Sequence, residues 1–490
     1  MNKNKKILIV VITILVLTIG ITFAYFMART GLGASANANI TADTVDDLKF
    51  SVSKDSLSLN INQFNFASGS GNISDSITAT ASLKANSTKN TATYNYYVYL
   101  SIDKNDYIYT TTDNKPEIVL TITGPNGEIT SLDNLSYVSA TNADGTIVKG
   151  FDITTIEPKL LKIADSYEIS SSSNTNYTNH EWTFTVTFIN LDTNQIDNEN
   201  GSLNGKVLIQ QEKMPETIAD VCDSGDVLAD CIVKAYNQIG GIIGLYYHND
   251  EMTNGAKDNS YRFSGTSNLV KNYVCYGNND DCYPGFRIIG LFDENNHGVT
   301  GKKLVKVIQS EVSSELAWRE NNFKNSSAND TLQNTYYPAL IETYKDLIAS
   351  ANWKVSGLSS SDLISKSIYD EEITNSSDTY SAKVGLIYIS DYAFATSPSY
   401  WTYSLNLYNK QQIYNSNWML PSLMISGSSY AYSISIDKNN IGKVFSVYTD
   451  GNITTNDINN FGLLTPTFYL NSDVIYAGGS GTYSDPIKIS

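Results

Sequence analysis

Hydrophobic and polar positions follow a strand-like pattern over much of the first half of the chain. Residues 50–61 (FSVSKDSLSLNI) alternate apolar and polar side chains, and residues 91–102, 116–123 and 180–191 are rich in β-branched and aromatic residues. Turn residues such as Gly, Pro, Asn and Asp separate these runs. Short strands at this spacing, without a long helical period, predict an all-β sandwich over residues 41–212.

The pattern changes at Lys213–Met214–Pro215. Apolar residues at helical spacing over 226–239, followed by Gly240–Gly241, predict a linker helix within residues 213–240. A second apolar stripe begins at Pro338, a residue suited to the first turn of a helix. Further strand-like runs lie at 286–292, 302–308, 383–389, 429–436, 443–449 and 466–472. The expectation for residues 241–490 is an α+β module with its helices early and its strands late.

The N-terminal pattern is that of a membrane segment. Residues 1–6 carry three lysines, and Ile7–Met27 is an uncharged run of Ile, Leu and Val long enough to span a bilayer as a helix. The lysines predict a cytoplasmic N-terminus and a single-pass anchor in the cell membrane, so the lipid bilayer is an expected partner through residues 7–27. A cleaved secretory signal is the alternative, because small residues in the linker 28–40 offer a cleavage site. Both alternatives export the remainder of the chain.

The composition of the chain argues against some classes of protein function. The 490 residues include 33 Lys and Arg against 50 Asp and Glu, for a net charge of −17, which argues against nucleic-acid binding. Charged residues make up only 17 %, and the chain has 34 tyrosines. An aromatic-rich sequence of this kind is typical of folded rather than disordered chains.

The four cysteines form two close pairs in the sequence, Cys222 with Cys231 and Cys275 with Cys282. Three pairings are open to four cysteines, and an oxidising, exported location favours the two local disulfides. A zinc site is the alternative, although the chain contains no C-x-x-C pair.

No sequence motif for catalysis is present. His180, His248 and His297 are isolated from one another, and the motifs of metalloproteases, serine hydrolases and P-loop proteins are absent from the sequence. Residues 293–304 begin like a calcium-binding loop but carry Leu304 where a bidentate Glu is needed, and residues 437–442 fail in the same way. We interpret both as Asx-type turns, and we expect no metal and no cofactor.

The aromatic, polar segments 390–404 and 415–422 contain the best candidate contact residues. Tyr400, Trp401 and Trp418 offer flat apolar faces with a polar edge, which suits carbohydrate stacking and protein contacts. The alternative is that the two tryptophans belong to the hydrophobic core.

Several motifs occur in order over residues 215–490: GLYYHND, DNSYRFSG, NYVCYG, FRIIGLF, KVGLIYISDYAFA and a closing FYLNSDVIYAGGSGTYSDPIKI. This series resembles an uncharacterised domain family of exported proteins in low-GC Gram-positive bacteria, often found behind a membrane anchor. Where the family pattern has Arg–Pro before its last strand, this chain has Thr465–Pro466. The order of motifs in its final third is also similar to the end of C-type-lectin-like domains. The anchor and sandwich are loosely similar to biofilm-matrix proteins of the camelysin type.

Three functions follow as hypotheses. The first is a non-catalytic surface protein whose second module binds a glycan, a cell-wall polymer or a surface protein. The second is a structural envelope or biofilm-matrix component that assembles through its β-sandwich. The third is an enzyme acting on envelope polymers, which has no recognisable catalytic constellation in its favour.

Overall fold

The protein is represented by a computed structural model. It describes residues 46–490 except 63–72, 133–134, 157–158, 277–284, 299–300, 311–313, 341, 360–362, 408–415 and 425–429. The chain divides into two compact units, Met1–Met214 and Pro215–Ser490. The division falls within the Lys213–Pro215 stretch where the sequence pattern changes.

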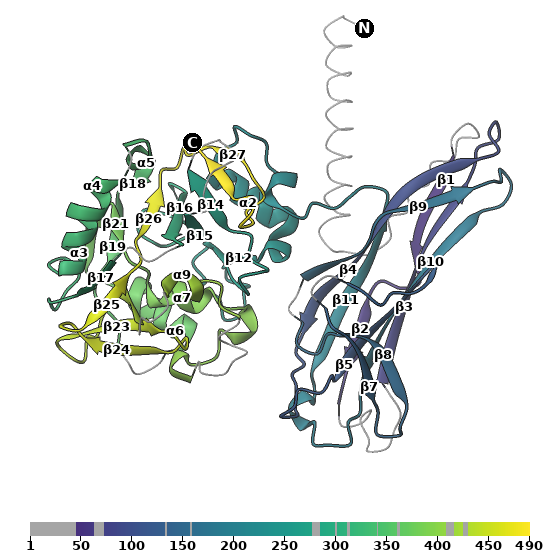
Figure 1. The fold of residues 1–490 in the computed structure, drawn as a ribbon, viewed down its shortest axis with the longest axis horizontal. Helices are drawn as coiled ribbons and strands as arrows, with labels where there is room; N and C mark the ends of the chain where they lie inside the picture. Colours follow the sequence, from purple (N-terminus) through teal and green to yellow (C-terminus); the bar gives the residue numbers. More distant parts are fainter. Residues whose placement is uncertain are drawn as a thin grey trace, which may run out of the picture. The chain divides into compact units, whose positions relative to one another are not determined.

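The first unit is built from strands and one short 3-10 helix (Figure 1). They are β1 (Asp47–Val52), β2 (Leu57–Asn60), β3 (Ile73–Lys84), β4 (Ala92–Asn105), β5 (Ile118–Gly124), β6 (Gly127–Glu128), β7 (Tyr137–Thr141), β8 (Ile147–Asp152), β9 (Lys159–Ser171), β10 (Thr178–Phe188), η1 (Ile196–Asn198) and β11 (Ser202–Gln210). One sheet has the order β1-β3-β10-β5-β8-β7 with β6 beside β5, and the other has the order β2-β11-β4-β9.

The two sheets of the first unit enclose one apolar core, so this unit is a β-sandwich. The alternation in the sequence is the cause: in β3, every second residue from Ile77 to Leu83 is buried. Trp182 on β10 is buried in this core, and its indole N–H donates to the hydroxyl of Tyr96 at 2.9 Å. This hydrogen bond satisfies the one polar atom that a buried tryptophan brings into a core.

The second unit contains many short elements. They are η2 (Ile218–Asp220), α2 (Leu228–Ile239), η3 (Gly240–Ile243), β12 (Leu245–Tyr247), β13 (Tyr261–Phe263), β14 (Tyr273–Tyr276), β15 (Phe286–Phe292), β16 (Leu304–Gln309), β17 (Ser314–Ala317), α3 (Ser327–Thr331), η4 (Leu332–Tyr336), α4 (Tyr337–Ala339), α5 (Glu342–Asp346), β18 (Ile348–Ala349), β19 (Ala351–Lys354), α6 (Ser365–Tyr369), η5 (Asp370–Thr374), β20 (Thr379–Ala382), β21 (Val384–Gly385), α7 (Ile389–Phe394), η6 (Pro398–Tyr400), η7 (Leu405–Leu407), α9 (Leu420–Leu423), β22 (Tyr430–Ile436), β23 (Lys443–Tyr448), β24 (Ile453–Asp457), β25 (Phe461–Leu464), β26 (Thr467–Leu470), β27 (Tyr476–Gly478) and β28 (Ile487–Ile489).

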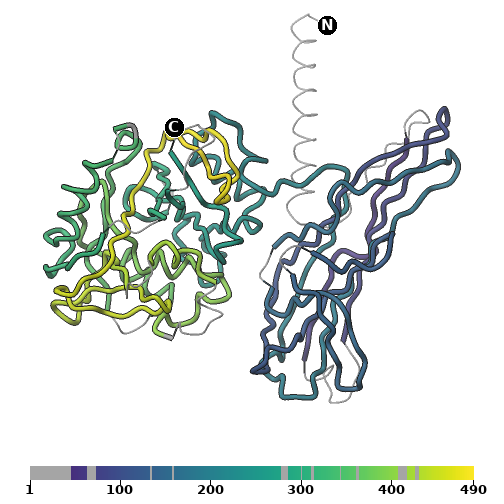
Figure 2. The backbone as a smooth tube through the Cα atoms, in the orientation of Figure 1, coloured from purple at the N-terminus to yellow at the C-terminus, as the bar shows by residue number. Residues whose placement is uncertain are grey.

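Two sheets organise the second unit. The larger has the order β18-β26-β16-β15-β14-β28-β27, with β12, β13 and β21 attached, and the smaller has the order β17-β25-β22-β23-β24. β19 and β20 pair with each other in a separate two-stranded sheet. Strands from the two ends of the unit meet in the larger sheet, since β28 runs parallel to β14. Figure 2 shows this meeting as the yellow end of the chain beside the teal segments.

The predicted fold class of the whole chain, in which the second unit is α+β, is wrong. Strands account for 42 % of the structure and helices for 16 %, so the fold is mostly β. The stretch that begins at Pro338 shows why. Its apolar residues do not stay on one helix: the chain turns out of α4 at Leu340, forms only the short α5, and enters the larger sheet as β18, where Ile348 pairs with Leu470. Burial in the sheet therefore overrides the local helical pattern.

Among the described residues, no helix is long and apolar enough to cross a membrane. The transmembrane helix of the predicted fold class is thus not part of the fold seen here. Residues 7–27, on which that prediction depends, lie outside the described residues, as do the flanking segments 1–6 and 28–40.

Candidate functional site

A polar cavity of about 240 Å³ lies in the second unit. It is lined by Asp293, Asn295, His297, Lys354, Ile373 and Thr374. The first three come from the turn that follows β15, Lys354 ends β19, and the last two belong to η5. Carboxylate, amide, imidazole and ammonium groups therefore share one small space.

The turn after β15 is fixed by its own side chains. Asp293 Oδ1 accepts hydrogen bonds from the backbone N–H groups of Asn295 at 2.7 Å and His297 at 3.2 Å. Asn296 has a φ of 65° and donates from its side chain to the carbonyl of Asn352 at 2.9 Å, which ties the turn to β19. This is the Asx geometry expected from the sequence rather than a calcium loop. Burial raises the pKa of Asp293.

A hydrogen-bonded chain leads from the cavity into the interior. His297 Nδ1 lies 2.6 Å from the hydroxyl of Tyr369, and that hydroxyl donates to Asp258 Oδ2 at 2.8 Å. Because the single hydroxyl proton is directed to the carboxylate, Nδ1 of His297 is the donor in the first contact. Nε2 of a neutral His297 is then left as a hydrogen-bond acceptor.

Behind this chain lies a buried network of four charges. Arg262 Nη2 is 3.0 Å from Asp258 Oδ2, Arg262 Nη1 is 3.7 Å from Asp391 Oδ1, and Lys306 Nζ is 2.6 Å from Asp391 Oδ2. None of these side chains is more than 3 % exposed. Two cations balance two carboxylates, which is the condition under which buried charges are tolerated.

The pKa shifts follow from this arrangement. Burial alone would raise the pKa of Asp258, but the charge of Arg262 outweighs it and holds that pKa well below its usual range. Burial lowers the pKa of Lys306, and Asp391 opposes that shift. Asp258 thus remains ionised at neutral pH.

Two further buried groups adjoin these elements. Glu372 accepts from the backbone N–H groups of Ile389 at 3.0 Å and Ser390 at 2.8 Å at the start of α7, and from the hydroxyl of Ser435. Its burial raises its pKa. His248 is completely buried and accepts from the N–H of Ala256 at 3.0 Å through Nδ1, and burial lowers its pKa to about 3. Both groups hold structure rather than face the cavity.

The three aromatic candidates do not line this cavity. Trp401 and Trp418 have no exposed surface. Trp401 donates to the carbonyl of Thr396 at 2.8 Å and Trp418 donates to that of Phe263 at 2.7 Å. Tyr400 is half-buried and packs against the same core. Neither indole presents a face to solvent in this conformation.

The predicted Cys222–Cys231 disulfide is not formed: both residues are buried free thiols. Proximity in sequence and an expected oxidising location indicated a bond, but two neighbouring free thiols give the same sequence signal. Cys282 lies outside the described residues, so its pairing with the buried Cys275 stays a prediction.

The network was missed at the level of sequence, although its residues lie within the motifs singled out there. Asp258 and Arg262 belong to DNSYRFSG, Asp391 belongs to KVGLIYISDYAFA, and Lys306 interrupts the apolar run LVKVI. A charged residue inside an apolar strand was the available signal, because such a residue must be buried with its partner.

No known protein family matches the chain, and no curated protein is similar to it.

Proposed function

We propose that the chain is an exported, membrane-anchored surface protein whose second unit binds a polar polymer, a glycan or cell-wall polymer, through the cavity formed by Asp293, Asn295, His297 and Lys354. The observation that supports this is a small cavity whose lining residues include carboxylate, amide, imidazole and ammonium groups, connected by hydrogen bonds to a buried network of charges. The anchor is the apolar run Ile7–Met27, and the β-sandwich serves as a spacer.

The chemistry of the cavity suits a ligand rich in hydroxyl groups. Nε2 of His297 is an acceptor, the ammonium of Lys354 is a donor, and the amide of Asn295 is both. Ile373 adds a small apolar wall. The volume of the cavity is below that of sites for drug-sized ligands, so the cavity suits one residue of a longer polymer chain.

The hydrogen-bonded chain behind the cavity favours a contact residue that is already oriented before the ligand binds. His297 is oriented by Tyr369, which is held by Asp258, which is paired with Arg262. Fixing a contact residue before binding reduces the entropy lost on association. Of the candidate contacts predicted from sequence, Trp401 and Trp418 require the core to open before they can stack on a sugar, whereas Tyr400 is half-buried.

The test is binding of the full-length protein, in detergent, to a panel of glycans, purified cell-wall polymers and whole cells. Removing one contact by His297→Ala or Lys354→Ala should weaken saturable binding about 10-fold, the equivalent of one charge-assisted hydrogen bond. His180→Ala in the first unit and Lys303→Ala outside the cavity are the matched controls. Binding that survives both cavity variants unchanged, or no binding by the folded protein, contradicts the proposal.

The location is tested separately by protease treatment of intact cells. An exported chain with a cytoplasmic N-terminus loses the two units to the protease while a short N-terminal fragment remains with the membrane. Full protection of the two units in intact cells would show that they are not exported.

A further inference from the structure

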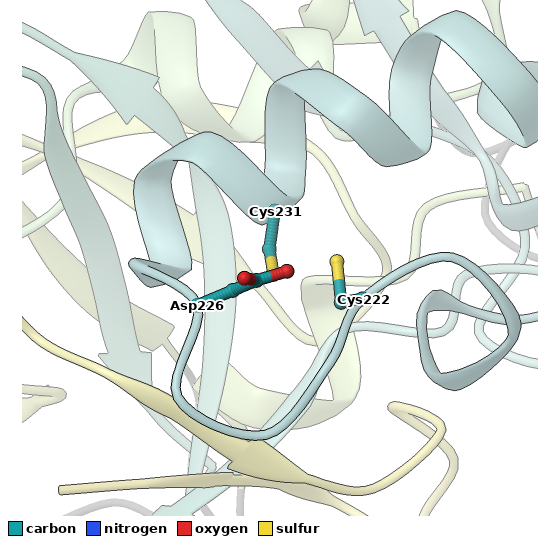
Figure 3. A group of neighbouring side chains, drawn as sticks. All are labelled: Cys222, Asp226 and Cys231. Carbon is teal, nitrogen blue, oxygen red and sulfur yellow. The ribbon is translucent and has the colours of Figure 1, made fainter.

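A second cluster of reactive side chains lies at the start of the second unit, away from the lining of the polar cavity. Cys231 is in the first turn of α2, Asp226 lies just before that helix, and Cys222 follows η2. Figure 3 shows the three side chains converging from the two sides of one loop. Their sulfur and oxygen atoms all lie within 4.8 Å of one another, and Cys231 Sγ is 3.9 Å from Asp226 Oδ2.

The loop that carries these groups is held by the backbone of another strand. The N–H of Gly225 donates to the carbonyl of Tyr476 at 2.9 Å, and the N–H of Tyr476 donates back to the carbonyl of Asp226 at 2.8 Å. Leu228 is bonded in the same way to Val474. Gly225 has a φ of 106°, which glycine adopts without strain. The three side chains are therefore brought together by the fold itself.

The donor set suits a soft divalent cation. Zinc takes thiolate sulfur at about 2.3 Å and carboxylate oxygen at about 2.0–2.2 Å in a tetrahedron, whose ligand–ligand edges are then about 3.5–3.8 Å. The 3.9 Å between Cys231 Sγ and Asp226 Oδ2 is close to such an edge. In the part of the chain that the structure describes, no fourth His, Cys, Asp or Glu joins the cluster.

Charge balance agrees with this assignment. Two thiolates and one carboxylate carry three negative charges, of which a divalent cation offsets two. Lys234 Nζ lies 3.8 Å from Asp226 Oδ2 and offsets the third.

We propose that Cys222, Asp226 and Cys231 bind one Zn²⁺ ion, with the fourth position open to water. The two cysteines are buried, whereas the Asp226 side chain is 41 % exposed, so the open position faces solvent on the Asp226 side. Zinc binding and a Cys222–Cys231 disulfide exclude each other, because the metal needs both thiolates.

The experiment is a zinc titration of the full-length, reduced protein against a chromophoric chelator, with stoichiometry from native mass spectrometry. One zinc per chain is expected. Cys222→Ser and Cys231→Ser should each weaken binding by about 100-fold or more, and Asp226→Asn by about 10-fold, in proportion to the ligand removed. Asp223→Asn is the matched control, because this neighbouring carboxylate is exposed and outside the cluster. Circular dichroism verifies that each variant is folded.

Cobalt gives a second readout that does not depend on affinity. Co²⁺ in a site with two thiolates should show a sulfur-to-metal charge-transfer band, which weakens in Cys222→Ser because Cys231 is then the one thiolate ligand left. Zinc binding of undiminished strength in Cys222→Ser, or none by the folded reduced protein, overturns the proposal. A Cys222–Cys231 disulfide and no metal in protein isolated without reductant would also overturn it.

Discussion

The first unit buries Glu117 among neutral donors, whereas the second unit buries Asp258 and Asp391 among cations. Glu117 has no exposed surface, and its carboxylate accepts from Thr110 N–H at 2.6 Å and Thr110 O–H at 2.7 Å, from Gln195 at 2.7 Å and from Asn198 at 2.8 Å. Within the described residues, no Lys or Arg forms an ion pair with it. In the second unit, the carboxylates of Asp258 and Asp391 are instead paired with Arg262 and Lys306.

This difference determines which substitutions destabilise each core. A carboxylate satisfied by neutral amides depends on the direction of a few hydrogen bonds, so an isosteric amide disturbs it. A paired charge depends on its countercharge, and the loss of one partner leaves a buried ion in a medium of low polarity. The two cores should therefore respond to different substitutions.

The largest effect is expected from Lys306→Met. The change leaves the Asp391 carboxylate 3.7 Å from Arg262 and without its closest cation, which should cost about 3–5 kcal/mol of unfolding free energy. Urea unfolding followed by tryptophan fluorescence measures it, since Trp318, Trp353, Trp401 and Trp418 report on the second unit. Lys303→Met removes a surface pair with Asp230 and should cost about 1 kcal/mol or less. Equal costs for the two variants would refute the contrast.

The next largest effect is expected in the pH dependence of the unfolding free energy, which should differ between the two units. Burial and the charge of Arg262 lower the pKa of His248 from 6.5 to about 3, so between these values the unfolded state binds a proton that the folded state does not. Stability is thus present above pH 6.5 and falls by about 1.4 kcal/mol per pH unit as pH drops toward 3. His248→Asn keeps an acceptor for Ala256 without titrating and should flatten this slope in pH-dependent urea unfolding. His180→Asn lies in the first unit and should leave the slope of the second unit unchanged, although burial lowers the pKa of His180 as well.

A smaller effect is expected from Glu117→Gln. The amide nitrogen introduced would face other donors, and Gln195 and Asn198 cannot rotate because their amides also bond to the carbonyls of Ile189 and Ile108. The cost should be about 1–3 kcal/mol, measured as unfolding of the first unit through Trp182. Glu128→Gln, at an exposed carboxylate, is the control. A neutral outcome for Glu117→Gln would mean that the hydrogen-bond directions do not matter.

The smallest effect is expected from Tyr369→Phe. The hydroxyl joins His297 to Asp258, and its loss removes two hydrogen bonds while Arg262 still pairs with Asp258. About 1 kcal/mol should be lost in urea unfolding, and polymer binding should weaken with it if His297 is a contact. Tyr403→Phe, at a tyrosine 42 % exposed, should change neither quantity.

Much of the strand pattern could be predicted from the sequence. The runs at 286–292 and 443–449 correspond closely to β15 and β23, and the helix predicted over 226–239 contains α2. These segments have a local pattern that agrees with their place in the fold. The run 383–389 does not, because β21 covers only Val384–Gly385 before the chain turns into α7.

The candidate site was less accessible to sequence reasoning. Trp401 and Trp418 are aromatic residues among polar neighbours, which is also the composition of a buried turn whose polar groups bond the backbone. His297 and Lys354 are 57 positions apart and meet only because the turn after β15 packs against β19. A single sequence does not show which isolated polar residues meet in the fold.

The pairing of β28 with β14 sets the order in which the second unit can assemble. Residues 474–489 contain the carbonyls that accept from the N–H groups of Gly225 and Leu228. They also contain β28, which pairs with β14, and β27, which pairs with β28. Contacts of such long sequence separation form late, since the whole intervening loop must close first. Until residues 474–489 are available, the start of the unit lacks its partner, and Cys222 and Cys231 lack the backbone that brings them together. Folding of this unit is consequently an event that follows synthesis of the segment 474–489.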